Sequence, residues 1–205
     1  MSTLVLIRHV ETDLAGAFCG HSDPDVNAAG ERQLRLLVEE IAPLGVSRIY
    51  SSDLRRTSRT ANAISERIGV PVELRPGLRE IHFGIWEGLR WAEVQHTYPD
   101  EAELWLREFS TRSAPGGESF PDFVVRVERE FNQLARENRD ITSVVVTHRG
   151  VMQYALTRFF GLSEADAWQG TKQYGALVVA ESIRKLPLPR FDVDRRTCEY
   201  RNQTR

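Results

Sequence analysis

The sequence predicts an α/β fold, a three-layer sandwich in which helices cover both faces of a mostly parallel sheet. Two short apolar runs, Leu4 to Ile7 and Val144 to Val146, have the aliphatic composition typical of strands buried on both faces. Segments with helical spacing of apolar residues alternate with these and other short strands, which is the pattern of α/β proteins. A chain of 205 residues is long enough to bury one large core, so we expect a single domain over residues 1–205.

The first part of the chain predicts a strand, a helix, a strand and a helix in that order. After the strand at Leu4 to Ile7, Asn27 is a candidate N-cap for a helix that runs as far as Pro43. A short strand is expected around residues 48–50. The second helix should end at Gly69. The capping oxygens expected at its start belong to Ser51, Ser52 and Asp53.

The second part contains a long irregular segment followed by regular elements. Residues 78–119 hold three of the four tryptophans and a turn signal at Pro115 to Gly117, and we interpret them as an insertion over the sheet and the active site. Apolar residues then step by four and three from Phe120 to Leu134, which predicts a long helix. A strand, a helix and a last strand are expected at residues 144–146, 151–159 and 176–180. The tail from Arg195 onward is too irregular to assign.

The composition indicates an ordinary globular protein. It is 41% hydrophobic and 27% charged with a formal net charge of -2, which gives no preference for nucleic acid or a membrane. The apolar runs are far shorter than the roughly 20 residues that cross a bilayer, and the N-terminus lacks a secretory pattern, so we expect a cytoplasmic protein. Cys19 and Cys198 lie far apart and are expected to be reduced. His21 is close to Cys19, but two such residues without further ligands do not predict a metal site.

A histidine closely follows each of the two buried strands. His9 comes after Leu4 to Ile7 and His148 after Val144 to Val146, each with one residue in between. In open α/β sheets, ligands bind at the carboxyl ends of the strands. This coincidence is the first indication of a functional site.

Four motifs in order, LVLIRHVET, SSDLRRTSRTA, LREIHFGIWEG and VVVTHRG, cover the chain from Leu4 to about Gly150. Together they resemble the histidine phosphatase superfamily, which includes the cofactor-dependent phosphoglycerate mutases. HFGIWEG and the later PGGESF are most similar to the branch that contains alpha-ribazole phosphatase. The resemblance implies a phosphoglycerate mutase-like fold and a phosphatase that needs no metal or other cofactor.

The resemblance also implies roles for individual residues, and physical chemistry is consistent with them. His9 would be the nucleophile, for which its imidazole must be neutral. A transferring phosphoryl group carries charge on its oxygens, so fixed cations should surround it. Glu80 would protonate the leaving oxygen and then activate water. The groups expected to grip phosphate are Arg8, Arg56 and His148, with Thr12 as a further hydroxyl contact.

Several assignments have a structural alternative. Helical rotation prevents Arg55 and Arg56 from pointing the same way, so Arg55 is expected at the surface. Trp86 could line the substrate pocket or pack in the core, like the other tryptophans of residues 78–119. Arg149 could contact substrate or point to solvent.

The sequence departs from the family pattern at three places. Val10 replaces the glycine that usually follows the nucleophilic histidine, so either the local backbone tolerates a β-branched residue or activity is reduced. Arg149 replaces the glycine after the second histidine. The mutases carry an asparagine at about the position of Asp13 to Gly16. This sequence has no asparagine there, so one hydrogen-bond donor to phosphate is missing.

Three functions follow from these observations. The first is hydrolysis of a small phosphomonoester through a phosphohistidine, with alpha-ribazole 5'-phosphate as the candidate substrate. The second is a phosphoglycerate mutase, which the missing asparagine disfavours. The third is a protein that binds phosphorylated ligands with little turnover, suggested by Val10 and Arg149 but disfavoured by the retained nucleophile and acid. The leaving group and the oligomeric state stay open, because the tryptophan-rich segment could form a homodimer contact or a pocket wall.

Overall fold

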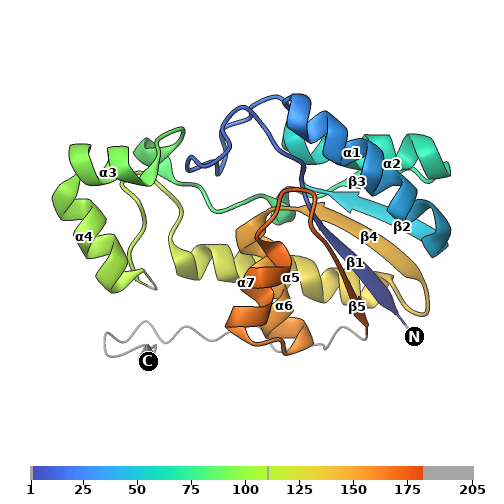
Figure 1. Cartoon of the computed structure of the whole chain (residues 1–205). Helices are drawn as coiled ribbons and strands as arrows, with labels where there is room; N and C mark the ends of the chain where they lie inside the picture. The colour runs from blue at the N-terminus through green and yellow to red at the C-terminus, as the bar shows by residue number, and fades with distance from the viewer. Residues whose placement is uncertain (1, 110, 182–205) are drawn as a thin grey trace.

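A five-stranded sheet lies at the centre of the computed structural model, which describes residues 2–109 and 111–181 (Figure 1). In spatial order the strands are β3 (Val72–Leu74), β2 (Val46–Ser51), β4 (Thr142–Thr147), β1 (Thr3–Arg8) and β5 (Leu177–Glu181). The β3–β2, β2–β4 and β4–β1 pairs are parallel, and only β5 pairs antiparallel, with β1. The predicted α/β fold with a mostly parallel sheet is confirmed.

Helices cover both faces of this sheet, as predicted. On one face lie α1 (Ala28–Ile41) and α2 (Arg55–Ile68). The other face carries α5 (Phe120–Glu137), α6 (Arg149–Phe160) and α7 (Glu164–Thr171) (Figure 1). Because side chains alternate along a strand, β1 contributes to two cores: Leu4 and Leu6 pack with α5 and α6, whereas Val5 and Ile7 pack with α1 and α2.

The helix ends show where local sequence decides structure. Asn27 caps α1 as predicted, accepting a hydrogen bond from Gly30 N at 2.9 Å. Gly69 ends α2 in the left-handed region with a φ of 75°, also as predicted. The predicted caps of α2 are wrong: its N-cap is Leu54, which makes no side-chain capping bond. The three residues have other partners, since Ser51 ends β2, Ser52 contacts His148, and Asp53 binds Arg79.

Residues 78–119 are more regular than the sequence indicated. They contain the helices α3 (Trp91–Thr97) and α4 (Pro99–Glu108), with proline in the first turn of α4. Figure 1 shows α3 and α4 beyond the carboxyl ends of the strands rather than over a face of the sheet. The physical reason is that this segment forms its own core, built around the fully buried Trp86 and Val94.

Besides α3 and α4, the strand β3 and the helix α7 were not predicted. The strand β3 has only three residues, and α7 lacks a strong apolar stripe. Short 3₁₀ helices complete the structure at Ala42–Leu44, Pro76–Leu78 and Gly84–Trp86. Within residues 2–109 and 111–181, none of the helices has the length and apolar character needed to cross a bilayer. The tail from Arg195 onward and Cys198 lie outside the described residues.

Candidate active site

His9 lies where β1 ends, at the carboxyl edge of the sheet. Its side chain is buried, and the ring Nδ1 donates a hydrogen bond to the Val10 carbonyl at 2.8 Å. This bond places the proton on Nδ1 and leaves the Nε2 lone pair available. Burial, reinforced by the Arg56 guanidinium, holds the pKa of His9 well below its ordinary value. The imidazole is therefore neutral, the form that a nucleophile requires.

His148 occupies the equivalent position on the neighbouring strand. Arg8 on β1 lies opposite Thr147 on β4, so the residues that follow them, His9 and His148, are neighbours. Their ring centroids are 5.3 Å apart. Arg56 Nη2 donates to Nδ1 of His148 at 3.1 Å, so the ring proton lies on Nε2, which donates to Ser52 Oγ at 2.8 Å. Burial and the Arg56 charge hold the pKa of His148 well below its ordinary value. His148 is thus neutral here, and its expected donation to phosphate stays a prediction that requires one of these contacts to break.

Arg56 is the central cation of the site. Its side chain is fully buried and oriented inward from the first turn of α2, whereas Arg55 is exposed and pairs with Asp25. The predicted division between the two arginines is confirmed. The carbonyls that accept hydrogen bonds from Arg56 belong to Ser22 at 2.6 Å, Gly20 at 2.6 Å and Cys19 at 3.1 Å.

Glu87 fixes the loop that supplies those carbonyls. Its carboxylate accepts backbone N–H bonds from Gly20, His21, Ser22 and Phe83. Burial raises the pKa of Glu87, but these hydrogen bonds outweigh it and bring the pKa below the ordinary value. Glu87 therefore holds the loop around Arg56 as a charged group, a positioning role that the sequence motif did not reveal.

Arg8 is the last residue of β1 and directly precedes His9. Its Nη1 donates to the carbonyls of Lys172 at 2.6 Å and Thr171 at 3.2 Å, at the end of α7. The guanidinium also stacks on the Tyr174 ring at 3.8 Å, and that ring lies 5.6 Å from the His9 ring. The C-terminal end of α7 thus positions the arginine that the family motif indicated.

Glu80 is a buried carboxyl group with a protonation tendency suited to an acid. Its oxygens accept bonds from the backbone N–H groups of Ile81 at 3.1 Å and Gly150 at 2.9 Å. Burial raises the pKa of Glu80, although these two hydrogen bonds and, to a smaller degree, the charges of Arg56 and Arg8 oppose the shift. Gly150 permits this contact, because a Cβ at that position would lie 2.5 Å from a Glu80 oxygen.

The structure shows the surroundings of Val10. Its side chain is fully buried and packs in the core beneath α1 and α2. Asp140 is the only non-glycine residue with positive φ in the part of the chain described, so Val10 needs no left-handed backbone. The backbone therefore accommodates Val10. Thr12 is buried nearby in an isolated bridge with Val26, and its hydroxyl contact with substrate stays a prediction.

The structure gives different surroundings to Arg149 and Trp86, the other two expected substrate contacts. Arg149 begins α6 with its guanidinium 3.6 Å from the Trp168 ring centroid, and its charge acts on both Arg8 and Glu80. It therefore lies at the site rather than in open solvent. Trp86 is fully buried in the core of residues 78–119, which favours the packing alternative.

The pair formed by Cys19 and His21 also has local partners. His21 Nε2 donates to the Glu80 carbonyl at 3.1 Å, and the Cys19 thiol donates to the Ser22 carbonyl at 3.7 Å. Cys19 is a free thiol. Across residues 2–109 and 111–181, His, Cys, Asp and Glu side chains form no group of three or more that could hold a metal ion.

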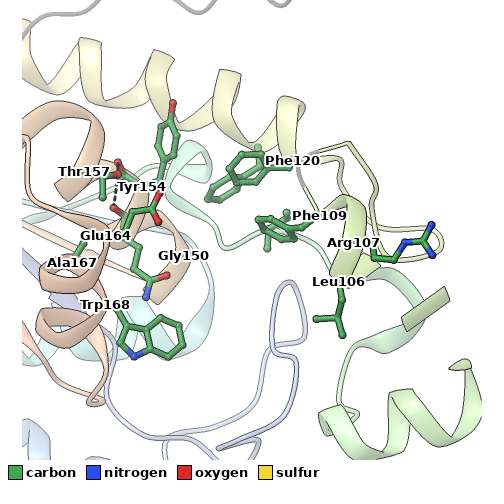
Figure 2. Close-up of a pocket in the computed structure, with 13 residues that line it drawn as sticks. Leu106, Arg107, Phe109, Phe120, Gly150, Tyr154, Thr157, Glu164, Ala167 and Trp168 are labelled. Carbon is green, nitrogen blue, oxygen red and sulfur yellow. Dashed lines mark hydrogen bonds between the residues drawn. The ribbon is translucent and has the colours of Figure 1, made fainter. Parts of the chain in front are cut away.

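A cavity of about 490 Å³ adjoins the site on the side of Glu80. Ile81 and Gly150, which donate backbone hydrogen bonds to Glu80, are part of its wall. Figure 2 shows Phe109 and Phe120 on one side of this cavity and Trp168 on the other. We call it the aromatic cavity, and its remaining lining residues are Leu106, Arg107, Phe123, Gln153, Tyr154, Thr157, Glu164 and Ala167.

Four residues of the site had no signal in the sequence that would have identified them. Ser52 was interpreted as a helix cap but orients His148, and Glu87 was part of a motif without an assigned role. Tyr174 and Trp168 lie on or after α7, which was not predicted. Each depends on a contact between segments far apart in the chain.

Comparisons with known proteins agree with this geometry. Residues 4–187 match the family model described as histidine phosphatase superfamily (branch 1). Phosphoserine phosphatase 1 of Hydrogenobacter thermophilus is 31% identical over 170 residues, which is 82% of this chain and 81% of that protein.

Two solved structures are similar along most of the chain. The alpha-ribazole phosphatase from Shigella flexneri superposes with a TM-score of 0.79 and 25% identity, covering 89% of this chain and 92% of that one. The mycobacterial glucosyl-3-phosphoglycerate phosphatase superposes with a TM-score of 0.74 and 28% identity, covering 87% and 89%. Their names confirm the predicted hydrolysis of phosphoric monoesters and the similarity to the alpha-ribazole phosphatase branch. The chain belongs to branch 1 of the histidine phosphatase superfamily.

Proposed function

We propose that the enzyme hydrolyses a small phosphomonoester by way of a phosphohistidine on His9. The observation that carries the proposal is the pairing of a neutral His9, whose Nε2 lone pair is available, with the buried Glu80, whose pKa burial raises. A nucleophile and an acid of this kind are the two groups that metal-independent phosphoryl transfer to histidine requires.

The cations of the site support binding of the phosphate group. Nε of Arg8 and Nε of Arg56 are buried and have no hydrogen-bond partner among the described residues. Leaving a charged donor unsatisfied costs free energy, which phosphate oxygens would recover by accepting these bonds. Arg149 adds a third guanidinium close to Arg8.

In the first step, His9 Nε2 attacks phosphorus and the phosphorus–oxygen ester bond breaks. Glu80 gives its carboxyl proton to the leaving oxygen, which departs as an alcohol. The Nδ1–H bond to the Val10 carbonyl stabilises the cationic ring that forms. In the second step, Glu80 takes a proton from water as the water oxygen attacks phosphorus, the phosphorus–nitrogen bond breaks, and inorganic phosphate and neutral His9 are restored.

For the substrate we propose alpha-ribazole 5'-phosphate, supported by the Shigella flexneri neighbour and by the aromatic cavity beside Glu80. The phosphoserine and glucosyl-3-phosphoglycerate phosphatases among the similar proteins define the main rival substrates. No observation at the site favours a mutase.

The test is phosphate release in the presence of EDTA from p-nitrophenyl phosphate, alpha-ribazole 5'-phosphate, phosphoserine and 3-phosphoglycerate, with wild type and His9→Ala. We expect metal-independent turnover that the variant loses and a highest kcat/KM for alpha-ribazole 5'-phosphate. Turnover that survives in His9→Ala would contradict the phosphohistidine. Binding of all esters without turnover would replace the hydrolase with a phosphate-binding protein.

A further inference from the structure

The aromatic cavity lies where a leaving group would be placed by the proposed reaction. Glu80 must contact the ester oxygen that it protonates, so the alcohol leaves on the side of Glu80. Ile81 and Gly150 connect that carboxyl group directly to the cavity wall. The volume of about 490 Å³ falls within the range of roughly 300–1,000 Å³ that is usual for small-molecule pockets.

The walls of the cavity suit a flat apolar group. Phe109, Phe120 and Phe123 line the cavity, and the Phe109 and Phe120 ring centroids are 5.0 Å apart. Trp168 faces them in Figure 2 and is 48% exposed, and Phe109 is 40% exposed. Exposed apolar side chains around a cavity next to a catalytic centre are typical of a ligand-binding surface.

One helix also presents unsatisfied donors to this region. Arg149 and Gln153 are four residues apart on α6 and therefore lie on the same face. Within residues 2–109 and 111–181, nothing accepts a hydrogen bond from Nε or Nη2 of Arg149 or from Nε2 of Gln153, although all three atoms are buried. Buried donors without acceptors are rare in folded proteins, and a ligand acceptor would satisfy them.

Trp168 connects these donors to the apolar walls. Its ring stacks against the Arg149 guanidinium at 3.6 Å, and both Trp168 and Gln153 line the cavity. A flat group between Trp168 and the phenylalanines would therefore lie within reach of the α6 donors. We propose that the aromatic cavity is the leaving-group subsite, in which Trp168 and Gln153 select esters whose alcohol combines a flat aromatic surface with a hydrogen-bond acceptor.

This inference rests on the proposed function, because it uses the role of Glu80 to orient the leaving group. It goes further by assigning substrate selectivity to Trp168 and Gln153. It also predicts that phosphoserine and phosphoglycerate, whose alcohols lack an aromatic surface, are poor substrates.

The kinetic test compares 4-methylumbelliferyl phosphate, which has a ring carbonyl as acceptor, with 1-naphthyl phosphate, which has none, and with phosphoserine. Each substrate is measured on the wild type and on a variant, so that the intrinsic reactivity of the leaving group cancels. Trp168→Ala should lower kcat/KM for both aryl esters about tenfold more than for phosphoserine, as expected for a lost aromatic contact. Gln153→Leu should lower kcat/KM for the umbelliferyl ester about fivefold more than for the naphthyl ester, as expected for one hydrogen bond.

Gln169→Leu is the matched control, because Gln169 is exposed beside Trp168 and does not line the cavity. It should leave the kcat/KM of all three substrates unchanged. Gln153→Leu removes a buried amide nitrogen that has no partner in the described structure, so its Tm should be no lower than that of the wild type. An equal loss on phosphoserine and on the aryl esters in Trp168→Ala would overturn the subsite.

A binding measurement separates failure of the subsite from failure of the proposed function. Calorimetry with His9→Ala and with His9→Ala/Trp168→Ala gives Kd values for the same three esters without turnover. If the double variant binds only the aryl esters more weakly, the result supports the subsite. This holds even if the wild type hydrolyses no ester, a result that would refute only the proposed function. Unchanged Kd ratios alongside normal turnover would refute only the subsite.

Discussion

The site at the strand ends and the aromatic cavity are built on opposite principles. At the strand ends, buried polar groups are held by several hydrogen bonds each, as in the three carbonyls around Arg56 and the two backbone N–H groups on Glu80. The cavity, by contrast, is lined mainly by apolar side chains.

This difference suits the two regions to different tasks, phosphoryl transfer at the strand ends and substrate selection in the aromatic cavity, under the proposals above. Groups that act on the phosphoryl group need fixed positions, whereas a cavity wall can change one side chain at a time. The similar proteins are named for phosphoserine, alpha-ribazole and glucosyl-3-phosphoglycerate, whose phosphate esters differ in the alcohol. Variants of the first region should affect all esters, and variants of the second should distinguish among them.

The largest effect should come from Glu80→Gln. An amide cannot supply the proton for the leaving oxygen, so we expect kcat to fall by roughly 10²–10⁴-fold for phosphoserine, with a smaller loss for p-nitrophenyl phosphate, whose leaving oxygen needs no proton. Steady-state kinetics measure both losses. Glu66→Gln, on the exposed face of α2, is the control. Equal losses for the two esters would contradict the acid role.

Gly150→Ala tests the boundary between the two regions, since Gly150 both binds Glu80 and lines the cavity. The new Cβ would lie 2.5 Å from a Glu80 oxygen and must displace it. We expect kcat to fall by up to about 100-fold for every ester, because a displacement near 1 Å can cost that much. Gly170→Ala, where the added Cβ would lie 3.4 Å from its nearest neighbour, is the comparison. A change confined to aryl esters would instead assign Gly150 to the cavity alone.

Glu87→Gln should loosen the loop that surrounds Arg56. The amide NH₂ group would face backbone N–H donors, which leaves some of them unsatisfied at a cost of about 1–3 kcal/mol of unfolding free energy. We expect a similar fractional loss of kcat for all esters, near tenfold. Urea unfolding and steady-state kinetics give the two values, and wild-type behaviour in both would show that the loop does not depend on this carboxylate.

Stability should fall as the pH drops below about 6.5, the ordinary pKa of histidine. His9 and His148 have folded-state pKa values well below that, so the unfolded chain binds more protons than the folded protein in this range. Glu80, whose folded-state pKa is raised, makes stability change with pH in the opposite direction. Its contribution is present in both the wild type and His148→Gln and does not affect their comparison. His148→Gln should therefore show a flatter decrease in unfolding free energy between pH 7 and pH 5 than the wild type. Urea unfolding at each pH gives these free energies. The same dependence on pH in the two proteins would argue against a neutral His148.

The smallest effect is expected at the rim of the cavity. Leu106 lines it but is 60% exposed, so Leu106→Ala removes little buried surface. We expect at most about a threefold loss of kcat/KM for aryl esters. Phosphoserine hydrolysis in the same variant provides the internal reference, and a loss shared by phosphoserine would place Leu106 outside the leaving-group region.

Sequence reasoning predicted most of the fold because its main signals are local. The buried runs of β1 and β4, the Asn27 cap and the Gly69 helix end each depend on a few adjacent residues, and the structure confirms them. The caps of α2 were mispredicted because Ser52 and Asp53 have distant partners, His148 and Arg79.

For the candidate site, family motifs indicated His9, Arg56 and Glu80, and the fold brings them close enough for the Arg56 charge to act on both of the others. The Arg149–Trp168 stack and the Tyr174 contact with Arg8 arise from α7, whose position depends on tertiary packing rather than on a local pattern.

Identification of the phosphorylated residue would test the central claim most directly. Glu80→Gln, which should be slow to activate water, is mixed with p-nitrophenyl phosphate, quenched in base to preserve phosphohistidine, and digested for peptide mass spectrometry. We predict a phosphoryl group on the peptide that contains His9 and none after the same treatment of His9→Ala/Glu80→Gln. A phosphoryl group on another residue, or turnover by the wild type without any phosphorylated His9 in the trapped enzyme, would contradict the mechanism.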